Sequence, residues 1–353
     1  MPFPVYLISR MNRDQTTIPA VAEPIGFSFY FMALVLLLVI FLHLATPLLA
    51  VLFTYLALTK LSFFKRGGKW LATVIFLVLL AGAAYGLGYV LNQTIRSLPE
   101  IADKSIPLII DWAKQYGIEL PFTDYDSLKD LAFDTVKGEV HYLGSVAKFA
   151  RGAAAQFLFM VAGCVVAISL FLNPRFELSR DPRASPDNLY LRCCQAIAER
   201  FATLYQSFVT VMGAQIIISG INTVLTGVFV LAMHLPYGVV VIGMTFLCGL
   251  LPVVGNLISN TIVVMIGFTV SPKMALGALI FLVVIHKLEY FLNSKIVGLR
   301  IRNPLWLTLL GLIVGERLLG VPGMILAPVV LNYIKLEATG ARRARATAMA
   351  TES

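Results

Sequence analysis

Two long apolar stretches in the last third of this chain, residues 237–272 and 304–333, are each interrupted near the middle by proline and glycine. Lipid offers no hydrogen-bonding partner to backbone groups freed at such a break, so a broken helix persists at membrane depth only where protein buries it or a watery cavity wets it. Paired interruptions of this kind indicate a transporter's binding site. We therefore predict a polytopic membrane protein that moves a substrate. The predicted break residues are Pro252, Gly255, Gly320, Pro322 and Gly323.

The composition supports the same class. Hydrophobic residues make up 58% of the chain and charged residues 13%, whereas about a quarter of a soluble domain is charged. A soluble core cannot absorb that much apolar surface, so the lipid bilayer is the predicted main partner. The net charge of +9 does not predict a nucleic-acid partner, because the basic residues sit in short loops beside apolar spans, where they set orientation.

The hydropathy pattern predicts an all-α polytopic integral membrane protein with about six full spans and two re-entrant helical hairpins, about eight hydrophobic segments in total. An extracytoplasmic helical insert interrupts the spans. The predicted segments are a cytoplasmic N-terminal tail (1–25), three spans (26–91), an extracytoplasmic amphipathic helical module (92–151), a fourth span (152–172), a cytoplasmic linker helix (173–203), a transport core with interrupted helices (204–336) and a basic cytoplasmic tail (337–353).

The hairpins follow from the positive-inside rule. If every apolar segment crossed fully, the basic loop 295–302 would lie outside, against that rule. If residues 237–272 instead enter and leave on the outer side, with arms of about 21 Å, the loop and both termini are cytoplasmic. Residues 304–333 then form a second hairpin from the cytoplasmic side. A single tilted helix for 304–333 stays open as an alternative.

The module at 92–151 is rich in acidic residues and has apolar residues at helical spacing, with one helix near 101–116 and another along 128–147. We predict that it lies on or just above the bilayer. It is either a packed lid or a surface that contacts substrate.

A polar stripe runs along the predicted fifth span, residues 204–233, with Gln215, Ser219, Asn222 and Thr226 on one face. The stripe either bridges neighbouring helices or lines a substrate path, in which case Gln215 and Asn222 are the lining residues. After the first break, Asn256 and Asn260 supply further donors and acceptors for a polar solute or a cation.

Ionisable residues at membrane depth are costly and mark functional sites. His286, Glu289 and Asn293 share one face of the span at 273–297, and Glu316 and Arg317 lie beside the second break. A carboxylate or an imidazole in a semi-wet site can take up and release protons, which is the machinery of a proton-coupled carrier. The alternative is structural: a Glu289–Arg317 or Glu316–Lys287 pair that only holds two helices together.

No catalytic constellation is present. The chain has no phosphate-binding glycine loop followed by Lys and Ser or Thr, and no HExxH or GxSxG motif. Its four cysteines lack metal or redox spacing. We predict that the protein is not an enzyme, has no catalytic residues and binds no cofactor or structural metal, with H⁺ or Na⁺ as the ion it would transport.

Two motifs resemble those of the autoinducer-2 exporter (AI-2E, PerM-like) family. Residues 251–258, Leu-Pro-Val-Val-Gly-Asn-Leu-Ile, are similar to the family's Pro-Tyr-Val-Gly-Pro segment. Asn303-Pro304-Leu305, running on to 320–328, resembles its closing His-Pro-Leu and Gly-x-x-Gly-x-x-x-Ala-x-Pro run. The chain departs from the pattern at Asn256, where Pro is usual, at Asn303, where His is usual, and at 316–317, where a Gly-rich pair is common.

The resemblance spans about residues 27–337 and implies a homo-oligomeric transporter of the bacterial inner membrane, with a pentamer as one expected form. Our first functional hypothesis is a secondary transporter, proton-coupled, that exports a small polar solute or a quorum-sensing-type signal. The alternatives are a sodium (lithium)/proton antiporter and a non-transporting membrane scaffold.

Overall fold

The computed structural model is helical and has no strand over the residues it describes, which are 23–64, 68–118, 142–173, 189–252, 254–296 and 304–352. In that part of the chain, α2, α3, α5, α6 and α10 are long and apolar enough to cross a membrane. These helices confirm the predicted class, an all-α polytopic membrane protein. The helices are α1 (Glu23–Phe41), α2 (Ala45–Phe64), α3 (Lys69–Gln115), α5 (Tyr142–Leu172), α6 (Leu189–Ala232), α7 (Gly238–Gly249), α8 (Val254–Val270), α9 (Pro272–Ile296) and α10 (Leu305–Glu352).

The apolar helices expose their hydrophobic side chains. Only 6% of the most apolar window of α3 is buried within the protein, so lipid or another protein chain must cover the rest. The sixth predicted span corresponds to α9, which carries Lys273, Lys287 and Glu289. Helices α7 and α8 have 12 and 17 residues, or about 18 and 26 Å, less than the roughly 30 Å of hydrocarbon.

The chain packs as two units. The first contains Met1–Val78, Gln156–Val211 and Asn303–Ser353, and the second contains Leu79–Ala155 and Met212–Arg302. Three of the four boundaries fall inside α3, α5 and α6, and each unit is considered by itself below. Several predicted segments lie outside the described residues, namely most of the N-terminal tail, most of the second helix of the acidic module, the start of the linker helix and the basic loop from residue 297.

In the second unit the chain breaks where the sequence predicted. Helix α7 ends at Gly249 and α8 begins at Val254, next to Pro252. The two helices pack against each other, and α8 also packs against α9. A Cβ at Gly255 would overlap the carbonyl oxygen of Cys248, so only glycine allows the chain to approach this closely after the break.

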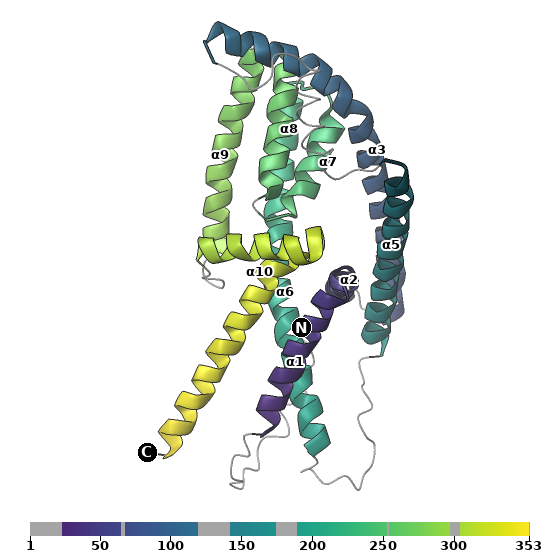
Figure 1. The fold of residues 1–353 in the computed structure, drawn as a ribbon, viewed down its shortest axis with the longest axis vertical. Helices are drawn as coiled ribbons and strands as arrows, with labels where there is room; N and C mark the ends of the chain where they lie inside the picture. The colour runs from purple at the N-terminus through teal and green to yellow at the C-terminus, as the bar shows by residue number, and fades with distance from the viewer. Residues whose placement is uncertain are drawn as a thin grey trace. The chain divides into compact units, whose positions relative to one another are not determined.

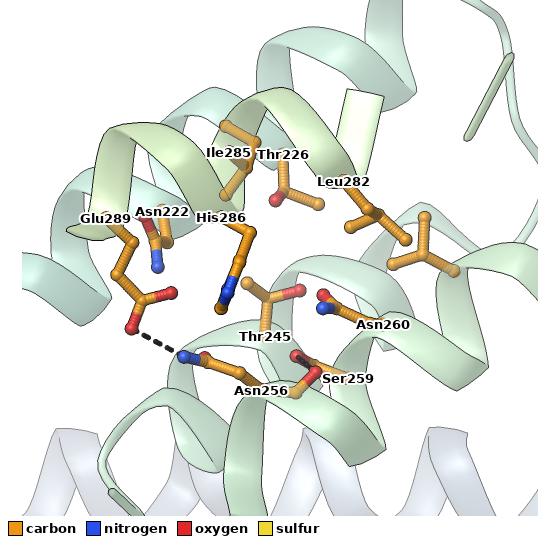
Figure 2. A pocket seen from close by; sticks show the side chains of 11 residues that line it. Asn222, Thr226, Thr245, Asn256, Ser259, Asn260, Leu282, Ile285, His286 and Glu289 are labelled. Carbon is orange, nitrogen blue, oxygen red and sulfur yellow. Dashed lines mark hydrogen bonds between the residues drawn. The ribbon is translucent and has the colours of Figure 1, made fainter. Parts of the chain in front are cut away.

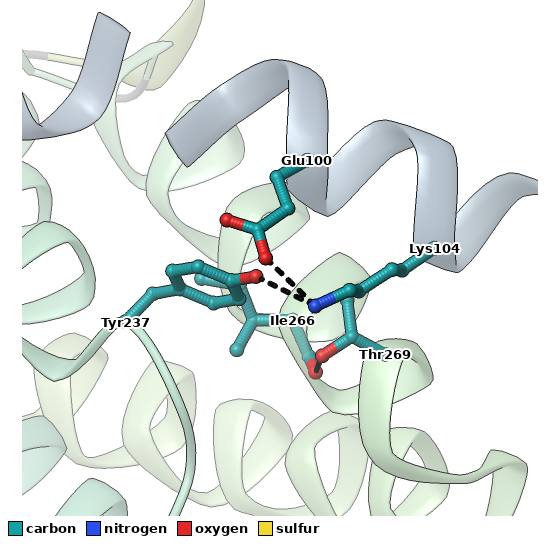
Figure 3. Close-up of polar contacts among 5 residues, drawn as sticks. All are labelled: Glu100, Lys104, Tyr237, Ile266 and Thr269. Atoms are coloured by element: carbon teal, nitrogen blue, oxygen red, sulfur yellow. Dashed lines mark hydrogen bonds and ion pairs between the residues drawn. The ribbon is translucent and has the colours of Figure 1, made fainter. Parts of the chain in front are cut away.

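The second half of α3 covers the ends of α7, α8 and α9 (Figure 1). Ile101 is buried in the core of this unit, and the Trp112 and Phe268 rings lie 6.2 Å apart. At the edge, the Lys104 ammonium donates to Glu100 Oε1 at 2.7 Å and to the Tyr237 hydroxyl at 3.5 Å (Figure 3). This part of the acidic module therefore packs as a lid on the hairpin.

The sequence predicted a span that ends near residue 91 and a separate helix near 101–116. The structure instead has one helix, α3, which continues through Pro99 and Pro107. Each proline removes one backbone hydrogen bond, and packing of the lid face onto the hairpin compensates. Similarly, α6 joins the end of the linker helix and the fifth span into one helix of 44 residues.

In the first unit, α10 folds back on itself at Gly320, where φ is 65° and ψ is −149°. A Cβ at Gly311 would lie 2.8 Å from Leu331, and one at Gly315 would lie 2.5 Å from the Gly323 carbonyl oxygen. In a straight helix, positions 311 and 331 would be about 30 Å apart. Residues 304–333 therefore form a helical hairpin rather than a single tilted helix, with small residues where the arms meet.

Replacing Gly320 by Ala should destabilise the hairpin by about 1–3 kcal/mol, because its backbone conformation is one that side chains with a Cβ rarely adopt. The measurement is the midpoint of thermal unfolding of the purified protein in detergent. The matched control is Gly220→Ala in α6, where no atom outside the local helix lies within 4 Å of an added Cβ. That change should be neutral or stabilising, so equal midpoints for the two variants would contradict the proposed role of Gly320.

The first unit also buries an ion pair. Arg200 of α6 pairs with Glu337 of α10, with side-chain exposures of 18% and 10%. The Arg200 guanidinium also donates to the Ser28 hydroxyl at 3.4 Å and lies over the Phe29 ring. Three helices that are distant in the sequence therefore meet at one arginine. The other carboxylate oxygen of Glu337 has no hydrogen-bond partner among the described residues.

Candidate functional site

The polar stripe of α6 meets the broken hairpin. Gln215 donates its side-chain amide to the Gly249 carbonyl at 2.6 Å, and Ser219 donates its hydroxyl to the Phe246 carbonyl at 2.8 Å. Both carbonyls lie in the last turn of α7, where the helix itself leaves such groups without partners. The first part of the stripe therefore satisfies the hairpin backbone, as membrane burial requires.

The second part of the stripe faces a cavity of about 10 Å³, which is room for roughly one water molecule. Side chains from α6, α7, α8 and α9 converge on it (Figure 2). The lining residues are Asn222 and Thr226 of α6, Thr245 of α7, Asn256, Ser259, Asn260 and Val263 of α8, and Leu282, Ile285, His286 and Glu289 of α9.

Glu289 forms the best-defined contact in this cavity. The Asn256 amide donates to Glu289 Oε1 at 2.5 Å, and Figure 2 shows the His286 imidazole beside this pair. Asn256 lies in the first turn of α8, whose N-terminal end carries a partial positive charge that favours a nearby carboxylate. The break thus places a hydrogen-bond donor and a favourable dipole end next to an acidic side chain.

Two oxygen atoms at the cavity are buried without a partner. The carbonyl oxygen of the Asn222 amide and the hydroxyl of Thr245 have no hydrogen-bond partner among the described residues, and their residues are 5% and 7% exposed. Buried polar atoms in native proteins are nearly always paired. These two oxygens therefore indicate a small polar occupant, a water or an ion, in the cavity that their residues line.

The predicted site residues divide into four groups. Asn222, Asn256, Asn260, His286 and Glu289 line the cavity, whereas Gln215 bonds the hairpin backbone instead. Asn293 lies in α9, but its side chain is outside what the structure describes. The remaining two belong to the first unit, where Glu316 and Arg317 are exposed and their side chains approach to 3.9 Å.

Thr245 is a polar lining residue that sequence analysis missed. Helix α7 is otherwise apolar or glycine, apart from a single cysteine. The single hydroxyl residue in this short apolar helix could therefore have been recognised as a candidate site residue. That signal is weak by itself, because threonine often bonds to its own helix backbone instead of facing a site.

Comparison with known proteins gives the family. The model described as "AI-2E family transporter" matches residues 27–338. The chain belongs to the AI-2E transporter family. The match confirms the resemblance based on the motifs at 251–258 and 303–328. Membership and the apolar helices together show that this AI-2E protein is a multi-pass membrane protein of a transporter family.

A curated relative points the same way over a shorter region. The AI-2E chain is 31% identical over 133 residues to a Bacillus subtilis (strain 168) protein named "Putative transport protein YdbI". That similarity covers 36% of this chain and 37% of the relative, so it spans little more than a third of either protein. It adds a transport protein as a relative and does not by itself identify a substrate.

Proposed function

We propose that this AI-2E protein is a proton-coupled secondary transporter in which Glu289 binds the coupling proton. One observation carries the proposal: a carboxylate at a helix break borders a cavity with room for about one water molecule, and no organic solute would fit there. A carboxylate that gains and loses a proton during transport needs contact with water, and a cavity of this size allows that contact without opening a wide aqueous path. Export of a small polar solute or signal molecule is the wider function that this coupling would drive.

The neighbours of Glu289 support this role. In the charged state, the carboxylate accepts the Asn256 amide hydrogen bond at 2.5 Å. Protonation would weaken that bond, because a hydrogen bond to a charged acceptor is stronger than one to a neutral group. Since Asn256 belongs to the first turn of α8, the proton would alter how strongly α9 holds the hairpin. His286, which lines the same cavity, adds a second polar group beside the carboxylate.

A sodium (lithium)/proton antiporter is the second candidate. The observation that favours it is the pair of buried, unpartnered oxygens on Asn222 and Thr245. Together with the Glu289 carboxylate, they offer the oxygen ligands that hard cations prefer. Unwound segments in transporters likewise offer oxygen ligands to Na⁺, through their backbone carbonyls. In this scheme the cation and the proton compete for Glu289, which is the basis of exchange.

The experiment uses proteoliposomes that contain a pH-sensitive dye and are made acidic inside. Sodium, lithium or potassium is then added outside. We expect sodium or lithium, and not potassium, to raise the internal pH in an exchanger. If no cation acts, the antiport candidate is wrong and a solute panel replaces the cations in the same assay. A protein that responds to neither set, with insertion verified, would support the non-transporting scaffold.

The oligomeric state, the membrane and the orientation of the chain are also proposals. We propose a homo-oligomer in the bacterial inner membrane with both termini in the cytoplasm, on the basis of family membership and the distribution of basic residues. The exposed apolar surface of α3 supports an environment of lipid or neighbouring subunits. Cysteine labelling from either side of the membrane would test the orientation.

A further inference from the structure

A groove of about 460 Å³ runs between α8 and α9, a volume typical of a small-molecule site. Its lining follows one stripe on each helix. On α8 the stripe includes Asn260, Val264 and Phe268, and on α9 it includes Leu279, Val283 and Lys287. This spacing of four residues places each set on one helix face. The groove is therefore a continuous surface that the hairpin and the last helix of the second unit build together.

The polarity of the groove changes along its length. Because α8 and α9 are joined by a short turn and run in opposite directions, the start of α8 lies beside the end of α9. Asn260, His286 and Lys287 therefore share one end. The other end, below the α3 lid, is apolar and holds Phe268 and Ile109. A ligand that fits this gradient has a polar head and an apolar tail.

The polar end of the groove joins the proposed coupling cavity. Asn260, Leu282 and His286 line both spaces. A head group in the groove would therefore lie next to the residues that surround Glu289. This continuity distinguishes the groove from an ordinary lipid-facing furrow between two helices.

The charge at the polar end specifies the head group. Lys287 is exposed to the groove, and no acidic side chain among the described residues pairs with it. A lysine within a membrane segment is costly unless it finds a partner. The ligand head that satisfies both the ammonium of Lys287 and the neighbouring imidazole is an anion.

We propose that this groove binds a single-tailed amphiphile with an anionic head, and that this amphiphile is the transported solute. The head lies at Lys287 and His286, and the tail runs between α8 and α9 toward Phe268 and the α3 lid. The assignment rests on the proposed transport function and takes its solute to be an amphiphilic signal molecule instead of a small polar solute. The solute reaches the coupling cavity sideways, along the groove, instead of through a polar pore.

Trp112 reports on the apolar end, because its ring lies 6.2 Å from that of Phe268, a groove residue. Replacing Trp70 and Trp306, both in the first unit, by Phe leaves Trp112 as the single tryptophan. The probe is stearic acid carrying a nitroxide quencher either near its carboxylate or near its methyl end. The full chain in detergent micelles is titrated with each probe. We expect saturable quenching of Trp112, stronger for the methyl-end label.

Two substitutions test the two ends of the ligand. Lys287→Gln should weaken binding of the acid by about tenfold or more, the scale of one hydrogen bond to a charged group, and should leave binding of the matching alcohol unchanged. Val283→Phe should block the groove. Its control is Val284→Phe on the adjacent position, which is similarly exposed, at 59% against 54%, and does not line the groove.

Several results would overturn the proposal. Quenching that does not saturate, or that is equally strong with nitroxide-labelled phosphatidylcholine, would make the occupant ordinary bilayer lipid. Loss of binding in Val284→Phe as much as in Val283→Phe would remove the groove as its location. Absence of binding while a cysteine at position 283 cross-links two chains would make a second copy the occupant.

The same measurements separate this proposal from the proposed function. If the acid does not bind but sodium or lithium still drives proton movement in proteoliposomes, the solute class is wrong and the coupled transporter stands. If the acid binds as expected while no proton movement can be elicited, the groove is a ligand site, and both the transport function and the assignment of the amphiphile as its solute are wrong.

Discussion

Replacing Glu289 by Gln is expected to abolish proton-linked transport while the protein still folds and inserts. Glutamine has nearly the same shape and can still accept the Asn256 amide hydrogen bond that Glu289 accepts at 2.5 Å, but it cannot bind and release a proton. Loss of a positioned proton-transfer group lowers rates by about 10²–10⁴-fold. In the dye assay, the variant should therefore fall to the leak rate of protein-free liposomes at every pH.

Two further variants make this result specific. Glu289→Asp keeps the proton-binding group but shortens its reach to Asn256, so it should transport slowly and retain pH dependence. Glu316→Gln removes an exposed carboxylate in the first unit and should leave the rate close to wild type. Transport by Glu289→Gln at the wild-type rate with the same pH dependence would rule out Glu289 as the proton carrier.

The broken helices could be predicted from sequence because the responsible chemistry is local. Pro252 and Gly255 interrupt the first apolar stretch, and the chain leaves the helix between Gly249 and Val254. Gly320 likewise marks the fold-back of α10. The continuity of α3 through Pro99 and Pro107 was missed, because it depends on burial of its lid face against α8, and such tertiary packing overrides local helix preferences.

In the candidate site, too, local features could be predicted from sequence and features set by neighbouring helices could not. Asn222, Asn256, Asn260, His286 and Glu289 could be singled out as polar groups in apolar segments, and they line one cavity. Sequence could not separate Gln215 from Asn222 on the same stripe. Gln215 lies about two turns earlier along α6, at the level of the hairpin break, where a carbonyl needs a donor. Which polar residue meets a backbone group and which meets a cavity depends on the neighbouring helix.

The second large effect is expected at the buried ion pair of the first unit. Arg200→Met should destabilise the protein by about 3–5 kcal/mol, because it leaves the Glu337 carboxylate buried without its counter-charge. The loss is unlike that of a surface ion pair, which is worth about 1 kcal/mol or less. One oxygen of Glu337 already lacks a hydrogen-bond partner among the described residues, so the Arg200 guanidinium is the main group that compensates its charge.

The double variant Arg200→Met/Glu337→Leu decides whether the destabilisation comes from the unpaired charge. Apolar side chains of similar volume can replace a buried pair with little loss, and sometimes with a gain. The double variant should therefore unfold at a higher temperature than Arg200→Met alone, with a coupling energy between the two positions of roughly 0.5–3 kcal/mol. Thermal midpoints of all four proteins in the same detergent give this cycle. If the double variant is as unstable as Arg200→Met, the lost contacts to Ser28 and Phe29, and not the stranded carboxylate, account for the stability that Arg200 provides.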